Sequence, residues 1–247
     1  MTSILHSALT HDDILEIPFY NSTLPLTQDF DWTAVPVYPL AHQLWTADYG
    51  GYSGQATLRL AATPQALILL FHVQEPDDAW PPRAVATQDS ESVYEDSCVE
   101  FFFRPQAAPD GEQAYINIEM NSRGVILSAL GSDRHVRQSL EPVIRPLIEV
   151  QTFGLALEHA NSSMNPKGVT LARTDWGLRL EISPDVFTWF NRSELTEFKP
   201  GLSLEANAYK CGDATVTPHY HALYPVTSET PNYHRPQDFG VLKLVEL

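Results

Sequence analysis

The sequence predicts an all-β protein, an antiparallel sandwich of two sheets with a jelly-roll-like arrangement, and three observations lead to this class. Apolar and polar side chains alternate with a period of two over several runs of strand length, as in antiparallel strands with two different faces. Clusters of Pro, Gly, Asp and Asn separate these runs and mark turns. Strands do not alternate with helices along the chain, which disfavours an α/β fold.

Seven segments carry the strand pattern. Residues 65–73 (QALILLFHV) form a continuous apolar run of strand length. Residues 97–103 (SCVEFFF) place Val99, Phe101 and Phe103 on one face, and the opposite face carries Cys98, Glu100 and Phe102. In chain order, the predicted strands cover residues 65–73, 97–103, 115–120, 125–130, 177–183, 202–209 and 241–245.

One short helix is predicted over residues 184–190, because Ser183 can cap its start and Pro184 suits the first helical position. Residues 1–50 contain prolines and aromatic residues without a regular period, so we expect them to wrap the sandwich as an irregular N-terminal extension. Sandwiches of this size are often undivided, and residues 1–247 are therefore expected to form a single domain.

Composition limits the classes of partner. The 247 residues include 31 acidic and 15 basic side chains, a formal net charge of -16. Such a surface repels phosphate backbones and anionic lipid, so neither nucleic acid nor a membrane is an expected partner. No run approaches the roughly 20 apolar residues of a membrane span. No signal peptide is visible, so the expected location is the cytoplasm, or outside it if a leader has been removed.

The chain has two cysteines, Cys98 and Cys211, which rules out a scaffold dense in disulfides. A single bridge between them is compatible with the sequence. Two reduced thiols within strands are the favoured interpretation.

Two neighbouring segments carry polar groups in strand-like sequence. Glu100 lies inside a very apolar strand, where a buried and unpaired carboxylate would be costly, so it must face solvent, a partner or a ligand. In residues 115–121 (YINIEMN), alternation puts Asn117, Glu119 and Asn121 on one face. This row of donors and acceptors suits a ligand rich in hydroxyl groups. The alternative is a sheet face that is simply solvated.

Two catalytic or metal-binding interpretations are also open. Glu100 and Glu119 could act as acid and base on a glycosidic bond if their strands are neighbours. His219 and His221 could share a strand face and bind a transition metal together with Cys211 or His234, although His-x-His is a weak signal and Pro218 interrupts the strand.

Four segments together resemble a known family. They are YEDSCVEFF at residues 94–102, YINIEMN at 115–121, NAYKCGD at 207–213 and PNYHRPQDFG at 231–240. The sequence resembles the family 9 carbohydrate-binding modules, and more closely the family-9-like domains that occur as independent proteins in bacteria. The resemblance covers most of the chain.

The resemblance implies a β-sandwich that holds a sugar ring between two aromatic side chains, with charged and amide groups bound to its hydroxyls. Tyr94 matches the first aromatic wall, Glu100 matches an acid later in that strand, and Asn117 and Glu119 match polar contacts from the next strand. The well-studied members carry Trp at the first wall and Arg in the next strand, where this sequence has Tyr and Asn.

For the second wall, which the family takes from a late loop, we expect Tyr224, with Tyr220 and Tyr233 as alternatives. Asn121 extends the polar row, and Lys210 or His234 could contribute from the loops. Some modules of the family bind structural calcium, but no residues are assigned to it here because no DxDxDG-type loop is present.

The function predicted from the sequence is non-catalytic binding of a mono- or oligosaccharide. One alternative is an interaction domain whose sugar site has decayed. A glycoside-processing enzyme with paired carboxylates is the other.

Overall fold

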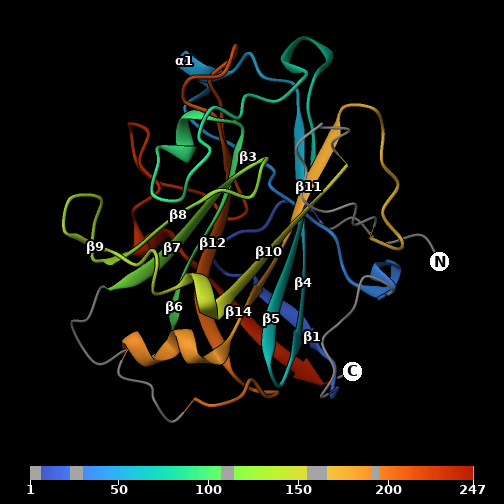
Figure 1. Ribbon diagram of the computed structural model, residues 1–247, viewed down its shortest axis with the longest axis vertical. Coiled ribbons are helices and arrows are strands. Elements are labelled where there is room, and N and C mark those ends of the chain that lie inside the picture. Colours follow the sequence, from blue (N-terminus) through green and yellow to red (C-terminus); the bar gives the residue numbers. More distant parts are fainter. Residues whose placement is uncertain (1–6, 23–29, 107–113, 155–165, 191–194, 247) are drawn as a thin grey trace.

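The computed structural model describes residues 7–22, 30–106, 114–154, 166–190 and 195–246, and it confirms the all-β class (Figure 1). The strands form one 14-stranded sheet with the main path β10-β11-β5-β4-β1-β14-β12-β6-β7-β8-β9. Where the sequence predicts two sheets, the described strands follow a single hydrogen-bonded path that curls on itself. None of the helices in the described ranges is long and apolar enough to cross a membrane.

The elements have the following bounds. One half of the path comprises β10 (Ile148–Phe153), β11 (Asp175–Ile182), β5 (Ala66–Gln74), β4 (Gln55–Thr63) and β1 (Ile14–Phe19). The other half comprises β14 (Gly240–Glu246), β12 (Ser203–Cys211), β6 (Cys98–Pro105), β7 (Tyr115–Asn121), β8 (Ile126–Gly131) and β9 (Arg137–Ser139). Short strands off this path are β2 (Tyr38–Pro39), β3 (His42–Gln43) and β13 (Tyr220–Ala222). The helices are α1 (Thr46–Tyr49) and the 3₁₀ turns η1 (Trp32–Ala34), η2 (Asp77–Ala79), η3 (Val93–Glu95), η4 (Arg145–Leu147), η5 (Pro184–Phe190) and η6 (Pro236–Asp238).

Strand β1 joins the two halves of the sheet. It pairs in parallel with β14 over its whole length, and Phe19 continues to Ala62 of β4. Leu15 and Ile17 are buried in the core. The expectation that residues 1–50 only wrap the fold is therefore wrong for this segment. Its six residues include Pro18 and give too short a pattern to stand out, and their strand conformation depends on the partner strands on both sides.

The main apolar core lies between the two halves of the curled sheet. It contains Leu69 and Phe71 from β5 together with Phe101 from β6 and Ile118 from β7. The continuous apolar run of β5 is explained by burial of both its faces, because Ile68 packs into a second apolar cluster on the other side.

The alternation predicted for residues 97–103 is confirmed. Val99, Phe101 and Phe103 lie in the main core, whereas Cys98 and Phe102 belong to a separate cluster on the opposite face of β6. Because side chains alternate along a strand, Glu100 lies on this second face as well.

The predicted helix is present over the same residues, as the 3₁₀ segment η5. The hydroxyl of Ser183 accepts a hydrogen bond from the backbone N–H of Asp185 at 3.2 Å, which agrees with a capping role. Phe187 and Phe190 of this segment pack into the main core and cover one end of it.

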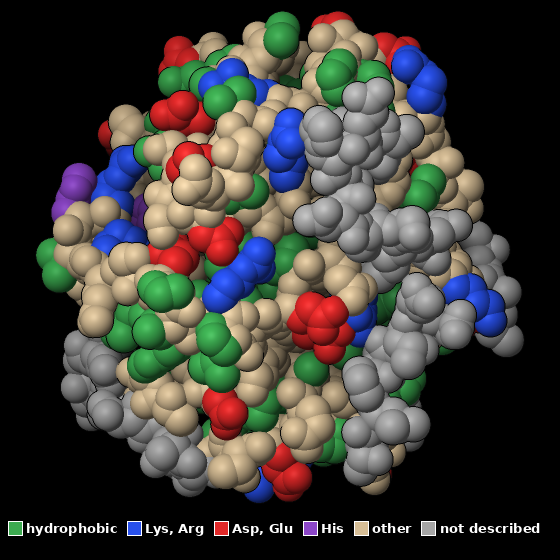
Figure 2. All heavy atoms as spheres, in the orientation of Figure 1, with side chains coloured by type: hydrophobic (Ala, Val, Ile, Leu, Met, Phe, Trp, Pro, Cys, Tyr) green, Lys and Arg blue, Asp and Glu red, His purple; other side chains and the backbone are tan. Residues whose placement is uncertain are grey.

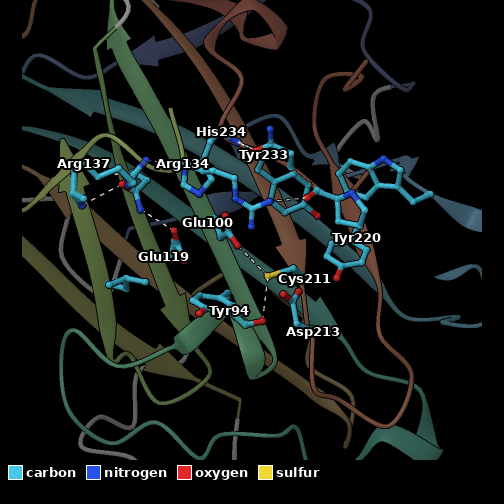
Figure 3. A pocket seen from close by; sticks show the side chains of 16 residues that line it. Tyr94, Glu100, Glu119, Arg134, Arg137, Cys211, Asp213, Tyr220, Tyr233 and His234 are labelled. Carbon is cyan, nitrogen blue, oxygen red and sulfur yellow. Dashed lines mark hydrogen bonds between the residues drawn. The ribbon is translucent and has the colours of Figure 1, made fainter. Parts of the chain in front are cut away.

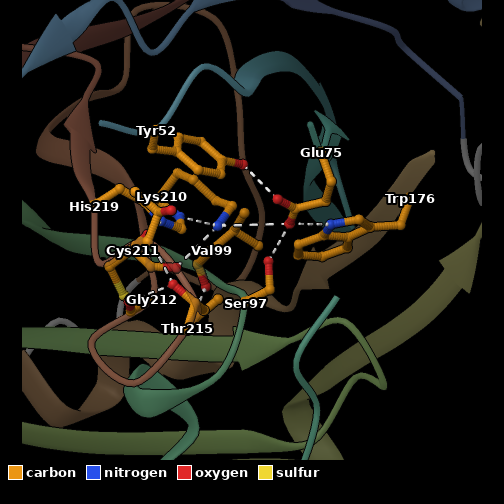
Figure 4. Close-up of polar contacts among 12 residues, drawn as sticks. Tyr52, Glu75, Ser97, Val99, Trp176, Lys210, Cys211, Gly212, Thr215 and His219 are labelled. Atoms are coloured by element: carbon orange, nitrogen blue, oxygen red, sulfur yellow. Dashed lines mark hydrogen bonds and ion pairs between the residues drawn. The ribbon is translucent and has the colours of Figure 1, made fainter. Parts of the chain in front are cut away.

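A buried carboxylate, Glu75, lies directly after β5 and accepts three hydrogen bonds (Figure 4). It accepts hydrogen bonds from the Tyr52 hydroxyl at 2.6 Å, from Trp176 Nε1 at 2.9 Å and from the Ser97 hydroxyl. Burial works to raise the pKa of Glu75, but the charge of Lys210 and these three donors outweigh it and leave the pKa below its ordinary value of 4.5.

Lys210 of β12 is the buried cation beside Glu75. Its Nζ atom is 3.8 Å from Glu75 Oε1 and donates to His219 Nε2 at 2.5 Å and to the backbone carbonyl of Cys211 at 3.0 Å. His219 Nδ1 is 2.8 Å from the carbonyl of Thr217, so a neutral ring that donates there can accept from Lys210. Burial and the charge of Lys210 lower the pKa of His219 to about 2, which keeps the ring neutral.

Replacement of Lys210 by Met should lower the free energy of unfolding by ~3–5 kcal/mol, because Glu75 would remain buried without its cation. Chemical denaturation at neutral pH measures this change. The double variant Lys210→Met with Glu75→Gln should recover part of the loss, since the neutral amide needs no countercharge. A Lys210→Met protein within 1 kcal/mol of wild type would show that the pair is not a structural ion pair.

Candidate functional site

A pocket of about 380 Å³ lies over the second face of strands β6, β7 and β8 (Figure 3). Its floor consists of strand residues, and its walls come from η3, from the chain around α1 and β13, and from the loop before η6. Acidic and basic side chains are interspersed among apolar ones on the face of the molecule drawn in Figure 2. The strands thus give the pocket a fixed floor, and the loops shape its sides.

Two carboxylates form the centre of the floor. Glu100 of β6 lies directly opposite Glu119 of β7 in the antiparallel register. The amide nitrogen of Asn117 donates to Glu119 Oε1 at 2.7 Å, while its oxygen accepts from the backbone N–H of Ala129 at 3.1 Å. Glu100 Oε1 accepts a hydrogen bond from the thiol of Cys211 at 2.9 Å. All four polar side chains are buried beneath the pocket.

Burial raises the pKa of both acids. The pKa of Glu100 is raised well above 4.5, first by burial and then by the neighbouring Cys211 and Glu119. Burial likewise raises the pKa of Glu119 to about 7, against the opposing effects of Arg137 and the hydrogen bond from Asn117. At neutral pH the floor therefore contains carboxyl groups that can donate as well as accept hydrogen bonds.

Tyr94 forms one wall of the pocket and is 37% exposed. It lies in η3, just before β6, and backbone hydrogen bonds tie this turn to the chain after β12. The N–H of Asp213 donates to the carbonyl of Tyr94 at 3.0 Å, and the N–H of Ala214 donates to the carbonyl of Glu95 at 3.1 Å. The ring is thus accessible while its backbone is fixed.

An aromatic cluster forms another wall, and Figure 3 shows its members Tyr220 and Tyr233 on the other side of Glu100 and Cys211 from Tyr94. Tyr233 stacks on Tyr209 with ring centroids 3.9 Å apart, and Trp45 meets Tyr220 edge to face at 5.2 Å.

Trp45 has a left-handed backbone, with a φ of 52°, and its Nε1 donates to the carbonyl of Ser228 at 2.8 Å. A strained backbone at a large aromatic residue in a pocket wall is typical of a functional position.

Basic groups lie at one side of the pocket. Arg137 of β9 donates to the hydroxyl of Tyr115 at 2.9 Å and is 2.7 Å from His234 Nδ1. Burial and the positive charge of Arg137 lower the pKa of His234 to about 3, so its ring is neutral and Nδ1 can accept. Arg134, in the turn before β9, contacts the carbonyl of Pro231 at 3.3 Å. Guanidinium groups thus flank a floor of carboxyl groups.

Five residues proposed from the sequence line this one pocket. They are Tyr94, Glu100, Asn117, Glu119 and His234. Tyr220 and Tyr233, which were alternatives for the second wall, line it too.

Asn121 was proposed as a polar contact, but it is completely buried and does not line the pocket. Its amide nitrogen donates to Asp96 Oδ2 at 2.9 Å and to the carbonyl of Ala86 at 3.0 Å. Asp96 also accepts from the backbone N–H groups of Val85 and Ala86, both at 2.9 Å. Asn121 and Asp96 therefore brace the loop that carries Tyr94, so Asn121 acts on the structure around the pocket rather than in it.

Two further proposed contacts are wrong. Tyr224, chosen for the second wall, is fully buried in the main core, and its hydroxyl donates to the carbonyls of Asp13 and Val241. Lys210 is equally buried and points to Glu75 and His219 instead of into the pocket. Alternation decides the second case, because Lys210 and Cys211 are neighbours on β12 and only Cys211 lines the pocket.

Several lining residues were not proposed from the sequence. Arg134 lies in the short turn after β8 and Arg137 begins β9, so the meander of β7, β8 and β9 could have indicated that both lie near the polar strand β7. Trp45 lies in the segment expected to be irregular, and its position depends on contacts with residues far away in the chain. No local pattern signals it.

The histidine metal site is not assembled among the described residues. His219 is bound to Lys210 and Thr217 and stacks on Tyr52 at 3.6 Å, so both of its ring nitrogens are occupied. Within the described ranges, the one close group of three possible metal ligands is formed by Cys98, Glu100 and Cys211. Calcium takes oxygen ligands only, so this group does not suit the calcium that the resemblance permits.

The fold and the pocket define a β-sheet domain with a concave site of aromatic and hydrogen-bonding side chains, a composition typical of small-molecule sites. The chain belongs to carbohydrate-binding family 9, whose family model matches residues 26–244.

Three solved structures share the fold. A candidate carbohydrate-binding protein from Bacteroides uniformis ATCC 8492 is 25% identical with a TM-score of 0.72, and the match covers 94% of this chain and 99% of that one. A family 9 module from Caldicellulosiruptor kristjanssonii in complex with cellotriose has a TM-score of 0.57 at 12% identity, covering 95% of each chain. A family 9 module from the same organism in complex with glucose has a TM-score of 0.57 at 13% identity, covering 94% of this chain and 96% of that one. The comparison with curated proteins found no match.

Replacement of Glu119 by Gln should change how stability depends on pH. Between pH 4.5 and about 7 the folded protein keeps the Glu119 proton, whereas the unfolded chain has released it. The contribution of Glu119 to the free energy of unfolding therefore falls as pH rises through this window. The free energy of unfolding of the Gln variant, minus that of wild type, should therefore increase by on the order of 3 kcal/mol from pH 4 to pH 8.

Urea denaturation of both proteins across this pH range measures the difference. The buried His219, His221 and His234, whose pKa values are lowered, make stability rise with pH, but they do so in both proteins and cancel. Glu100 adds to the difference in the same direction, because the charge of Glu119 helps to raise its pKa in the wild-type protein only. A difference between the two proteins that stays constant with pH would refute a raised pKa at Glu119.

Proposed function

We propose that this protein binds a mono- or oligosaccharide in the described pocket without catalysing a reaction. The observation that carries the proposal is the exposed Tyr94 beside a floor of buried carboxyl and amide groups, with an aromatic cluster on another side. Aromatic faces cover the apolar C–H face of a pyranose, and the polar floor orients its hydroxyls. The volume of about 380 Å³ is within the range of small-molecule sites, about 300–1,000 Å³.

Each wall has a distinct part in this proposal. Tyr94 stacks on one face of the ring, and Trp45, Tyr220 or Tyr233 takes the place that Tyr224 cannot occupy. Glu100 and Glu119 exchange hydrogen bonds with the hydroxyls. Glucose and cellotriose in the two related modules support a sugar as the ligand class.

Binding is favoured over hydrolysis by the placement of the two acids. Glu100 and Glu119 are directly opposed partners of adjacent strands, so they lie side by side on one face of the sheet. Glycoside hydrolysis needs one carboxyl group ionised while the other is protonated, whereas burial in the same floor raises the pKa of both acids here. Two neighbouring acids that are raised together instead suit hydrogen bonds with two adjacent hydroxyls. The accessible ring of Tyr94 in an open pocket likewise favours a retained site over a decayed one.

Replacement of Tyr94 by Ala should weaken sugar binding by ~1–3 kcal/mol, because the stacking area of one aromatic ring is lost. Isothermal titration calorimetry with glucose, cellobiose, xylobiose and cellotriose first identifies the ligand, and the same titration of the variant gives the loss. Tyr224→Phe is the matched control: it changes a tyrosine in the core and should leave affinity unchanged.

Folding of each variant is checked by circular dichroism. Saturable binding that survives Tyr94→Ala would remove Tyr94 from the site. No heat with any of the sugars, in a folded protein, would favour the interaction domain with a decayed sugar site.

A further inference from the structure

Two cysteines face each other beneath the pocket. Cys98 of β6 and Cys211 of β12 are directly opposed in the antiparallel register. Directly opposed residues have Cβ atoms about 4.5–5.5 Å apart, so their two sulfur atoms can reach a common point. Both thiols are free and buried.

Glu100 brings an oxygen ligand to the same point. It lies two residues after Cys98 on β6 and therefore shares its face of the strand. The Cys211 thiol is 2.9 Å from Glu100 Oε1, and one ligand atom from each of the three residues lies within 4.8 Å of the others. Figure 3 shows Glu100 and Cys211 pointing toward each other.

We propose that Cys98, Cys211 and Glu100 form a binding site for a zinc-like divalent metal ion in the floor of the pocket. Two sulfurs and one carboxylate match the ligands of zinc, whereas calcium and magnesium require oxygen ligands. Zinc bonds of about 2.3 Å to sulfur and about 2.0–2.2 Å to oxygen place tetrahedral ligand atoms roughly 3.3–3.8 Å apart. The observed upper limit of 4.8 Å is close enough for small side-chain rotations to close the site.

The fourth coordination position faces the pocket. Cys211 and Glu100 both line it, so a water molecule or a ligand oxygen can complete the tetrahedron from that side. Three protein ligands with one open position are typical of zinc sites that bind an external molecule. Binding exchanges protons for the metal, since thiolate and carboxylate are the ligating forms.

Titration of the reduced, intact protein with cobalt(II) tests this proposal directly. The protein is kept anaerobic with a phosphine reductant, and two free thiols are confirmed beforehand. We expect one equivalent of cobalt to bind with thiolate-to-cobalt charge-transfer absorption and tetrahedral visible bands, and zinc to displace it. Cys211→Ser and Cys98→Ser should each reduce or abolish the charge-transfer absorption, and Glu100→Gln should weaken binding while retaining it.

His135→Gln is the control for adventitious binding, because His135 is an exposed histidine that does not line the pocket. It should leave the cobalt spectrum unchanged. Absence of charge-transfer absorption in the folded, reduced wild-type protein would overturn the proposal without depending on any variant. A spectrum unaffected by Cys211→Ser in a folded variant would overturn it as well. The titration contains no sugar, so its outcome is separate from that of the sugar-binding proposal.

Discussion

The register of β6 between β7 and β12 is the constraint on which the pocket and the core both depend. It directs Val99, Phe101 and Phe103 into the main core and turns Glu100 to the opposite face, where Glu119 and Cys211 meet it. A slip of β6 by one residue would exchange its two faces and bury Glu100 in the apolar core. The apolar face therefore fixes the position of the polar one, and core packing and site geometry are one structural feature.

Two of the buried carboxylates, Glu75 and Glu100, differ in how their charge is compensated. Glu75 receives three donors and the charge of Lys210, and its pKa is lowered. Glu100 receives a thiol donor and has another carboxyl group as its strand partner, and its pKa is raised. A buried carboxylate with hydrogen-bond donors and a countercharge stabilises the fold. A carboxyl group that lines a pocket without a countercharge is typical of a binding site.

Much of this architecture could be predicted from the sequence, because alternation along a strand is a local property. The strands around Phe101 and Ile118, and the polar face with Asn117 and Glu119, follow from a period of two alone. Tyr224 was misplaced because its orientation depends on how the late loops fold over the sheet. Lys210 was misplaced because the predicted strand ends at residue 209, whereas β12 continues to Cys211 and alternation turns Lys210 away from the pocket. Strand β1 was missed because its partners, β14 and β4, are distant in the chain and its own six residues carry little pattern. Trp45 was not predicted as a pocket residue for the same reason, since tertiary contacts hold its left-handed backbone.

The pocket has a floor of strand residues and walls of turn and loop residues. The floor residues lie on four adjacent strands, β12, β6, β7 and β8, so their spacing is set by the sheet, whereas Tyr94, Trp45 and Tyr233 lie on turns and loops at its sides. The strand that carries Asn117 lacks the arginine of well-studied family 9 modules, yet guanidinium groups reach the pocket from the β8–β9 turn and from β9 through Arg134 and Arg137. The same type of group thus enters from a different element. A site built in this way can keep its chemistry while the direction of each contact, and with it the preferred sugar, changes.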